Sequence, residues 1–316
     1  MITISIITPC FNEEDNVETC AITVRELFKS KLPIYNYEHI FTDNNSTDST
    51  VNKLKRLAME DSRIKVLVNS RNVGPFKNMW NAMKWSTGDA VIPFLPADLQ
   101  DPPYVIEKFV KEWSKGTLIV YGKRVNRQEN IIFRVMRSFY YRLIALLAES
   151  EIPKHVGEFL LIDRKVLSTI LDLDDEYPYI RGLIAQTGVD SVSIPYTWEK
   201  RLTGKSKNSF LKLLDQGING LVSTTRAPAR IALLFWFSLS ILGIISSLTI
   251  FIQSLGSSTI FENASMIYAL VLFVFGVNLF FLGLIGEYIL SIHAQVRKSP
   301  KMYVKESINF TTNRSH

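Results

Sequence analysis

The chain has 316 residues, 47% of them hydrophobic, and a formal net charge of +6 at pH 7. That length allows one large domain or two smaller ones, with ample residues for a core. A basic chain can bind nucleic acid or an anionic membrane surface. No nucleic-acid-binding motif is present, so we exclude nucleic acid as a partner and favour the membrane. Cys10 and Cys20 lack zinc-like spacing, which indicates reduced core thiols.

Short apolar runs alternate with helical patterns along the first 121 residues. The runs have the length and composition of buried strands, and helical patterns separate the first four of them. Such alternation is typical of a mostly parallel sheet with helices on both faces, so the sequence predicts an α/β fold. The predicted strands are 2–8, 39–42, 65–68, 90–95 and 118–121, and the predicted helices are 14–30, 48–60 and 75–86.

Polar clusters follow each of the first four predicted strands. Ligands of such sheets bind beyond the carboxyl ends of the strands, where these clusters would meet. A structural turn could explain any one cluster, but four at a single edge indicate a binding site. The clusters are 9–13, 43–48, 69–74 and 98–101.

The fourth cluster combines a helix start with two oxygen ligands. Asp101 precedes Pro102 and Pro103, which predicts an Asp N-cap with proline in the first helical turn. That role does not account for Asp98 and Gln100, whose carboxylate and amide oxygens could share one hard cation. Magnesium takes few protein ligands and leaves positions for diphosphate oxygens.

Two long uncharged runs lie near the C-terminus, at 231–252 and 263–286. The first has 22 residues, and a bilayer core needs about 20 helical ones. We predict two transmembrane helices, at about 231–252 and 265–288, over the alternative of buried core helices. Lys and Arg cluster outside both runs and are absent from the loop between them, which places both outer flanks in the cytoplasm.

Apolar residues at helical spacing precede the first run. They suit an amphipathic helix in the headgroup layer, and the alternative is an ordinary surface helix packed on the domain. These apolar residues are Phe210, Leu213, Leu214, Ile218 and Leu221. We therefore expect a cytoplasmic catalytic domain (1–208), an amphipathic juxtamembrane helix (209–230), two transmembrane helices (231–290) and a cytoplasmic basic tail (291–316).

Several short motifs occur in a fixed order along the chain. They are Thr8-Pro9-Cys10-Phe11-Asn12-Glu13, Asp43-Asn44-Asn45-Ser46-Thr47-Asp48, Arg71-Asn72-Val73-Gly74, Gly88-Asp89 and Ala97-Asp98-Leu99-Gln100-Asp101-Pro102-Pro103. In this order and spacing they resemble the family-2 glycosyltransferases of the GT-A fold. More narrowly, the chain resembles polyprenyl-phosphate glycosyltransferases, such as dolichol-phosphate mannose synthase and the bacterial undecaprenyl-phosphate glucosyltransferases.

The resemblance implies an activity and a location. A sugar would pass from a nucleotide sugar, UDP-linked, to a polyprenyl phosphate with inversion, giving a lipid-linked sugar for cell-surface glycan or O-antigen (lipopolysaccharide) modification. Mg²⁺ or Mn²⁺ would assist. The protein would be a two-pass integral protein of the bacterial plasma membrane, with its catalytic domain and both termini cytoplasmic, in contact with membrane lipids and as a homo-oligomer, a tetramer in the family.

The resemblance also implies roles for individual residues. Donor-binding residues would be Pro9, Phe11, Asn12, Glu13, Asp43, Asn72 and Gly74, with Asp43 accepting from the uracil ring. The metal would be held by Asp98 and Gln100, and the catalytic set would be Asp98, Asp101 and Glu158. The acceptor phosphate would meet Arg124, Arg137, Arg201 and Ser206.

Two departures from the family pattern bear on the chemistry. Pro96 stands where the family has the first Asp of Asp-x-Asp, so another residue, with Glu158 as the candidate, would have to compensate. The usual Gly-Asp-Phe-Arg reads Gly157-Glu158-Phe159-Leu160, in which Glu158 keeps the carboxylate on a longer side chain. A phosphate acceptor is largely dianionic at about pH 7 and needs no strong base, so Asp101 and Glu158 would orient groups. The alternatives are transfer to a lipid-linked oligosaccharide hydroxyl and a catalytically inactive membrane scaffold.

Overall fold

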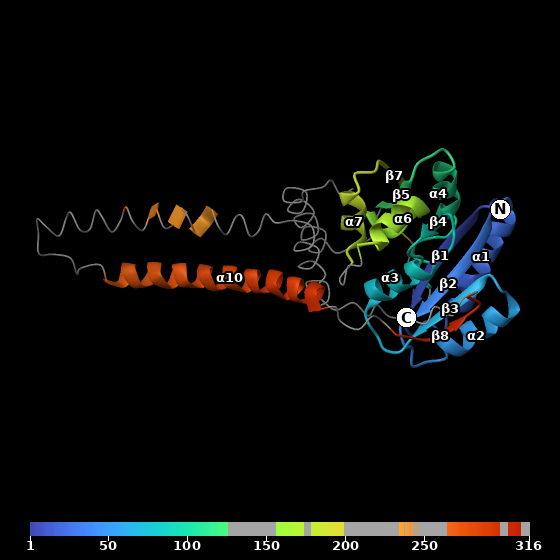
Figure 1. The fold of residues 1–316 in the computed structure, drawn as a ribbon, viewed down its shortest axis with the longest axis horizontal. Helices are drawn as coiled ribbons and strands as arrows, with labels where there is room; N and C mark the ends of the chain where they lie inside the picture. The colour runs from blue at the N-terminus through green and yellow to red at the C-terminus, as the bar shows by residue number, and fades with distance from the viewer. Residues whose placement is uncertain are drawn as a thin grey trace, which may run out of the picture.

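The computed structural model describes an eight-stranded sheet covered by helices, together with one long C-terminal helix (Figure 1). The residues it describes are 1–125, 156–173, 178–198, 234–236, 238–239, 241–242, 245, 264–297 and 303–310. The expected amphipathic helix at 209–230 and most of the first predicted span lie outside these residues. So do Arg137, Arg201 and Ser206.

The strands form one mixed sheet in the order β7-β5-β6-β4-β1-β2-β3-β8. The four strands β4, β1, β2 and β3 pair in parallel, and β5 and β7 are parallel to each other. β6 and β8 pair antiparallel with their neighbours. The strands are β1 (Thr3–Cys10), β2 (Asn36–Asp43), β3 (Ile64–Asn69), β4 (Ala90–Ile92), β5 (Ile119–Val125), β6 (Val156–Asp163), β7 (Ser191–Thr197) and β8 (Val304–Ile308).

Helices cover both faces of this sheet, so the central strands are apolar on both sides. On β1, Ile4 and Ile6 pack into the core beneath α1, α2 and α4, while Ile7 joins the second core beneath α3, α6 and α7. The helices are α1 (Val17–Lys31), α2 (Thr50–Glu60), α3 (Pro75–Trp85), α4 (Val105–Trp113), α6 (Arg164–Leu171), α7 (Ile180–Gln186) and α10 (Ala264–Arg297).

The expected α/β fold is confirmed, with its first five strands and first three helices in chain order. β4 ends at Ile92, three residues earlier than predicted, because Pro93 has no N–H with which to continue the ladder. β6, β7 and β8 were not predicted. β8 belongs to the sheet, so the expected boundary at residue 291 separates this strand from the sheet with which it pairs.

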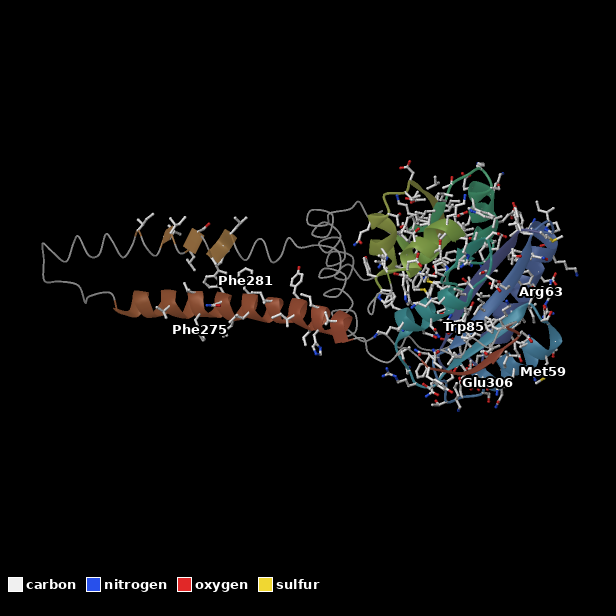
Figure 2. The ribbon with its side chains drawn as sticks, viewed as in Figure 1. Met59, Arg63, Trp85, Phe275, Phe281 and Glu306 are labelled. Atoms are coloured by element: carbon white, nitrogen blue, oxygen red, sulfur yellow. The ribbon has the colours of Figure 1, made fainter. Side chains whose placement is uncertain are left out.

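The segment 303–310 fastens the C-terminal part of the chain to the edge strand β3. Asn309 donates from Nδ2 to the carbonyls of Ala58 and Ile64, at 2.7 and 2.8 Å. The Phe310 ring meets the Trp85 ring edge-on, with 5.1 Å between centroids. Figure 2 labels Trp85 and Glu306 in this region of the domain.

The long helix α10 has 34 residues and extends away from the sheet (Figure 1). Figure 2 labels Phe275 and Phe281 on different sides of it; Phe275 is 59% exposed, and Phe281 lies 5.7 Å from Phe235 between ring centroids. By the joint measure of length and apolar character, none of the helices in the described ranges qualifies as a membrane span.

Candidate active site

The loops after β1 and β2 are tied to each other by side chains of their own motifs. Asn12, with a left-handed φ of 55°, donates from its backbone N–H to Ser46 Oγ at 2.8 Å. Its Oδ1 in turn accepts from the Thr47 N–H at 2.8 Å. Glu13 continues the contact, since its N–H donates to Thr50 Oγ1 at 2.9 Å. Pro9 and Phe11, which precede Asn12 in the chain, are half-buried.

Asp43 ends β2 with a side chain that is fully buried. Its two oxygens accept from the N–H and the hydroxyl of Ser46, at 2.8 and 2.5 Å. Burial nevertheless raises the pKa of Asp43, and the nearby Asp48 charge adds to the rise. Within the described part of the chain, no cation pairs with Asp43. The carboxylate is therefore an acceptor whose charge is incompletely compensated.

The loop after β3 is joined to the same edge through Asn44 and Asn72. Asn44 Nδ2 donates to Asn72 Oδ1 at 2.9 Å, and Asn44 Oδ1 accepts from the Val73 N–H at 3.0 Å. Gly74 has φ 84° and ψ 162°, a backbone conformation that only glycine adopts without strain. The first turn of α3, with Pro75 at its start, thus begins at the edge that carries Asp43.

The loop after β4 places Asp98 and Gln100 at this edge as well. Leu99 between them has φ 56°, and the Gln100 N–H donates to Asp98 Oδ1 at 3.3 Å. Asp98 is 9% exposed. In the residues that the structure describes, no group of three His, Cys, Asp or Glu side chains gathers as a metal cluster. One carboxylate and one amide still fit an ion such as Mg²⁺, which takes most of its oxygens from water and phosphate.

Asp101 does not cap a helix, contrary to prediction. α4 begins at Val105, and the Asp101 carboxylate instead accepts two hydrogen bonds from Arg124, Nε to Oδ1 at 2.9 Å and Nη2 to Oδ2 at 2.5 Å. The Tyr196 hydroxyl adds a third at 2.5 Å. The Asp101 carboxylate binds Arg124 and not a helix N–H, because a bidentate guanidinium compensates a buried charge better than a backbone N–H does. That Arg124 binds an acceptor phosphate stays a prediction.

Glu158 lies near the start of β6. Because β6 runs antiparallel to β4 and β5, its beginning reaches the edge where the parallel strands end. Its Oε1 is 3.0 Å from Nε of Arg181, which also donates from Nη1 to the Val156 carbonyl at 2.9 Å. Glu158 as a helper of the metal site stays a prediction.

One family motif lies at the opposite edge of the sheet. Gly88 and Asp89 precede β4, and a Cβ at Gly88 would stand only 2.6 Å from Ser5 Oγ and 2.7 Å from Ser5 N. The Asp89 carboxylate accepts from the Thr3 N–H at 2.8 Å. This motif therefore holds the amino ends of β1 and β4 together and does not contribute to the site.

The structure thus brings the four predicted clusters to one edge, and adds residues that sequence reasoning missed. Tyr196 had no local signal, because its partner Asp101 is 95 residues away. Asn44 stands inside a quoted motif, but nothing in its neighbours along the chain reveals that it bridges two loops. Arg181 likewise has no local signal that it pairs with Glu158.

A mixed sheet with a parallel centre and polar loops gathered at its carboxyl edge is the architecture of the GT-A class of glycosyltransferase. Residues 5–171 match the model of glycosyl transferase family 2. The chain belongs to that family and is a glycosyltransferase, as predicted.

Relatives match nearly the whole chain. A provisionally named glycosyltransferase of Bacillus subtilis, CsbB, is 32% identical over 304 residues, which are 96% of this chain and 92% of the relative. The SfII prophage-derived bactoprenol glucosyl transferase of Shigella flexneri is 28% identical over 305 residues, 96% of this chain and 98% of its own. The mannosyltransferase PcManGT of Pyrobaculum calidifontis, solved with GDP-Man and Mn²⁺, superposes with a TM-score of 0.46 at 15% identity, over 94% of this chain and 88% of that one.

Proposed function

We propose that this glycosyltransferase moves a sugar from a UDP-sugar to a polyprenyl phosphate at the cytoplasmic face of a membrane. The observation that carries the proposal is the match to a bactoprenol glucosyl transferase along 96% of this chain and 98% of the relative. The match extends beyond the nucleotide-binding sheet to the C-terminal segments, where a lipid acceptor would bind. A transferase for lipid-linked oligosaccharide remains the second candidate.

The donor would bind at the carboxyl edge of the sheet. Asp43 suits the N–H of a uracil ring, because a buried carboxylate without a cation gains from a donor. Around it the nucleotide sugar would meet the loops that hydrogen bonds hold in place. The donor-binding residues would be Pro9, Phe11, Asn12, Glu13, Asp43, Asn72 and Gly74.

Asp98 and Gln100 would hold Mg²⁺ or Mn²⁺ beside the donor diphosphate. When bound, such an ion offsets the charge that builds on the departing nucleotide diphosphate. Asp98 supplies a carboxylate and Gln100 an amide oxygen from a loop that the left-handed Leu99 bends between them. Pro96 leaves this site with one carboxylate fewer than the family pattern, and Glu158 would compensate across the edge.

The acceptor site needs cations but no strong base, since a phosphate monoester is largely dianionic at about pH 7. Guanidinium groups bind phosphate oxygens bidentately and stay charged. The acceptor ligands would be Arg124, Arg137, Arg201 and Ser206. Asp101 and Glu158, each already paired with an arginine, would orient those cations and would not remove a proton.

The membrane part of the proposal rests on the two uncharged runs and on α10. Large apolar side chains of α10 are exposed at a spacing of three or four residues, among them Phe275, Leu279 and Leu282, so they line one side of the helix, as expected of a side that faces lipid. Segments 231–252 and 265–288 would span the membrane, 209–230 would lie at its surface, and 1–208 and 291–316 would be cytoplasmic. By family analogy the protein would form a tetramer and serve cell-surface glycan or O-antigen modification.

The test is transfer itself. Purified protein in detergent is incubated with undecaprenyl phosphate, MgCl₂ or MnCl₂, and each of a panel of radiolabelled UDP-sugars and GDP-mannose, and the lipids are extracted and separated. We expect one labelled lipid whose sugar is released by mild acid. Parallel reactions receive a lipid-linked oligosaccharide in place of undecaprenyl phosphate. Label only in those reactions would favour the second candidate, and no label in any lipid would refute the proposal.

A further inference from the structure

Asp101 connects the loop that carries Asp98 and Gln100 to side chains of β5 and β7. Arg124 of β5 and Tyr196 of β7 stand side by side in the register of these two parallel strands. Both bind Asp101, and Arg124 Nε also lies 3.0 Å from the Tyr196 hydroxyl. The three side chains form a closed cluster, which we name the Asp101 clamp.

The Asp101 clamp is built for rigidity. Asp101 is 1% exposed, and its carboxylate is held by two bonds from one guanidinium and one from a phenol. Charge-assisted bidentate pairs are stronger and more directional than neutral hydrogen bonds. Trp198 adds its ring 5.7 Å from the Arg124 guanidinium. A side chain in such a clamp fixes the backbone that carries it.

The backbone next to the clamp is strained. Leu99 has a left-handed φ of 56°, which a residue other than glycine keeps only when its surroundings enforce it. On one side, the Leu99 N–H donates to the Pro96 carbonyl at 3.0 Å. On the other side, the side chain of Asp101 anchors the loop to the sheet. The left-handed residue Leu99 lies between Asp98 and Gln100, so its conformation sets the directions in which the backbone presents the two residues.

We propose that Tyr196 and Arg124 are positioning residues that act through Asp101 to hold the Asp98–Gln100 loop in the shape that receives the donor diphosphate and its divalent cation. The inference rests on the proposed function only for the identity of the ligand. For Arg124 this positioning role is an alternative to the acceptor-phosphate role proposed above, because Nε and Nη2 are committed to Asp101, and the test separates the two roles. Tyr196, 95 residues away from Asp101, becomes a determinant of donor binding.

The test compares Tyr196→Phe with Tyr37→Phe, a matched loss of a hydroxyl from a buried tyrosine near the opposite end of the sheet. Arg124→Lys is compared with Arg63→Lys, because Arg63 makes the same bidentate contact to Asp61 before β3. The readouts are the KM for UDP-sugar, the KM for undecaprenyl phosphate, Mn²⁺ binding followed by electron paramagnetic resonance, and the thermal shift produced by UDP with MnCl₂.

We expect Tyr196→Phe to raise the donor KM and the Mn²⁺ dissociation constant in the presence of UDP about 3- to 10-fold, the range of one lost hydrogen bond. The acceptor KM should stay within about twofold, and Arg124→Lys should follow the same pattern more strongly. Tyr37→Phe and Arg63→Lys should leave both constants unchanged.

A rise in the acceptor KM alone would overturn the inference and make Arg124 a direct acceptor ligand. A lower melting temperature with unchanged constants would also overturn it, because the clamp would then be structural only. The binding measurements need no transfer. If wild-type protein bound UDP and Mn²⁺ but glycosylated no lipid, the proposed function would fail while the clamp was still being tested.

Discussion

The two ends of β2 carry buried carboxylates that the protein treats in opposite ways. Glu38 near the amino end is 3% exposed, and Asp43 at the carboxyl end is fully buried. Glu38 accepts from Ser5, Lys65 and Thr87, with Lys65 Nζ at 2.5 Å from Oε2. Asp43 accepts from Ser46 alone among side chains and has no described cation beside it.

Their pKa values move apart for this reason. Burial raises the pKa of Asp43, and the bonds from Ser46 offset only part of the rise. Burial also works against ionisation of Glu38, but hydrogen bonds from Lys65, Ser5 and Thr87 outweigh it and hold the pKa below its usual value. A compensated carboxylate fastens strands, and an incompletely compensated one is available to a ligand. This difference supports the proposal that the carboxyl edge of the sheet binds the donor, whereas the amino edge holds strands together.

The strongest test of this difference between the two edges removes one carboxylate from each edge near β4. Asp98→Asn should lower turnover by about 100-fold or more, because the metal it would hold lowers the activation barrier by several kcal/mol. Asp89→Asn, at the amino edge, should keep turnover within about twofold. Steady-state transfer with the melting temperature measured alongside checks both. Full activity of Asp98→Asn, or of the wild-type protein in excess chelator, would contradict the assignment.

Among the substitutions considered, Glu38→Gln should cause the largest loss of folding stability. Breaking a buried ion pair leaves the Lys65 charge uncompensated, which costs about 3 kcal/mol and lowers Tm by about 6–12 °C. Because the folded pKa of Glu38 is lowered, its stabilisation is present above the unfolded value of about 4.3 and is lost as pH falls through the folded value. The variant should therefore show less additional loss of Tm in acid than wild type. A Tm within 1 °C of wild type at about pH 7 would show that the pair is not structural.

Asp43→Asn should weaken donor binding and change the stability of the fold little. The raised pKa means that the carboxylate costs folding stability above its folded pKa, so an amide should change Tm by less than about 2 °C. Loss of the charged acceptor should raise the KM for UDP-sugar about tenfold, since a charge-assisted bond contributes about 1.5 kcal/mol or more. Donor titrations and thermal melts test this. A large fall in Tm with unchanged KM would place Asp43 among the structural carboxylates.

The smallest effect should come from an exposed carboxylate of the same sheet. Glu306 of β8 pairs with Lys55 at 2.6 Å, but the side chains are 40% and 34% exposed. Glu306→Gln should therefore cost less than about 1 kcal/mol. Chemical denaturation measures it. A cost equal to that of Glu38→Gln would show that burial does not separate the two pairs.

Sequence patterns predicted the part of the fold that depends on neighbours in the chain. The central parallel strands can be predicted because they are apolar on both faces and read as continuous apolar runs. The place of the binding site can be predicted because ligands of such sheets bind beyond the carboxyl ends of the strands. Asp101 was misassigned because Pro102 and Pro103 give a strong local helix signal, whereas its actual partners, Arg124 and Tyr196, are 23 and 95 residues away.

β8 shows the same limit for secondary structure. Its sequence Val-Lys-Glu-Ser-Ile is short and polar, and it pairs with β3 more than 200 residues earlier in the chain. No local periodicity distinguishes such an edge strand from a charged tail. The pairing is specified by the exposed edge of β3 and by contacts such as those of Asn309, which exist only in the folded protein.

The return of the chain to β3 also constrains its biosynthesis. Strands β1 to β7 and β8 share one sheet, so they must lie in one compartment. Whatever the chain does between Trp198 and Tyr303, it can cross a membrane only an even number of times. Until residues 304–308 leave the ribosome, β3 is an open edge that can pair with other chains. β3 thus gains its outer partner only after the long segment between them has been synthesised, and truncation before Tyr303 leaves that edge open permanently.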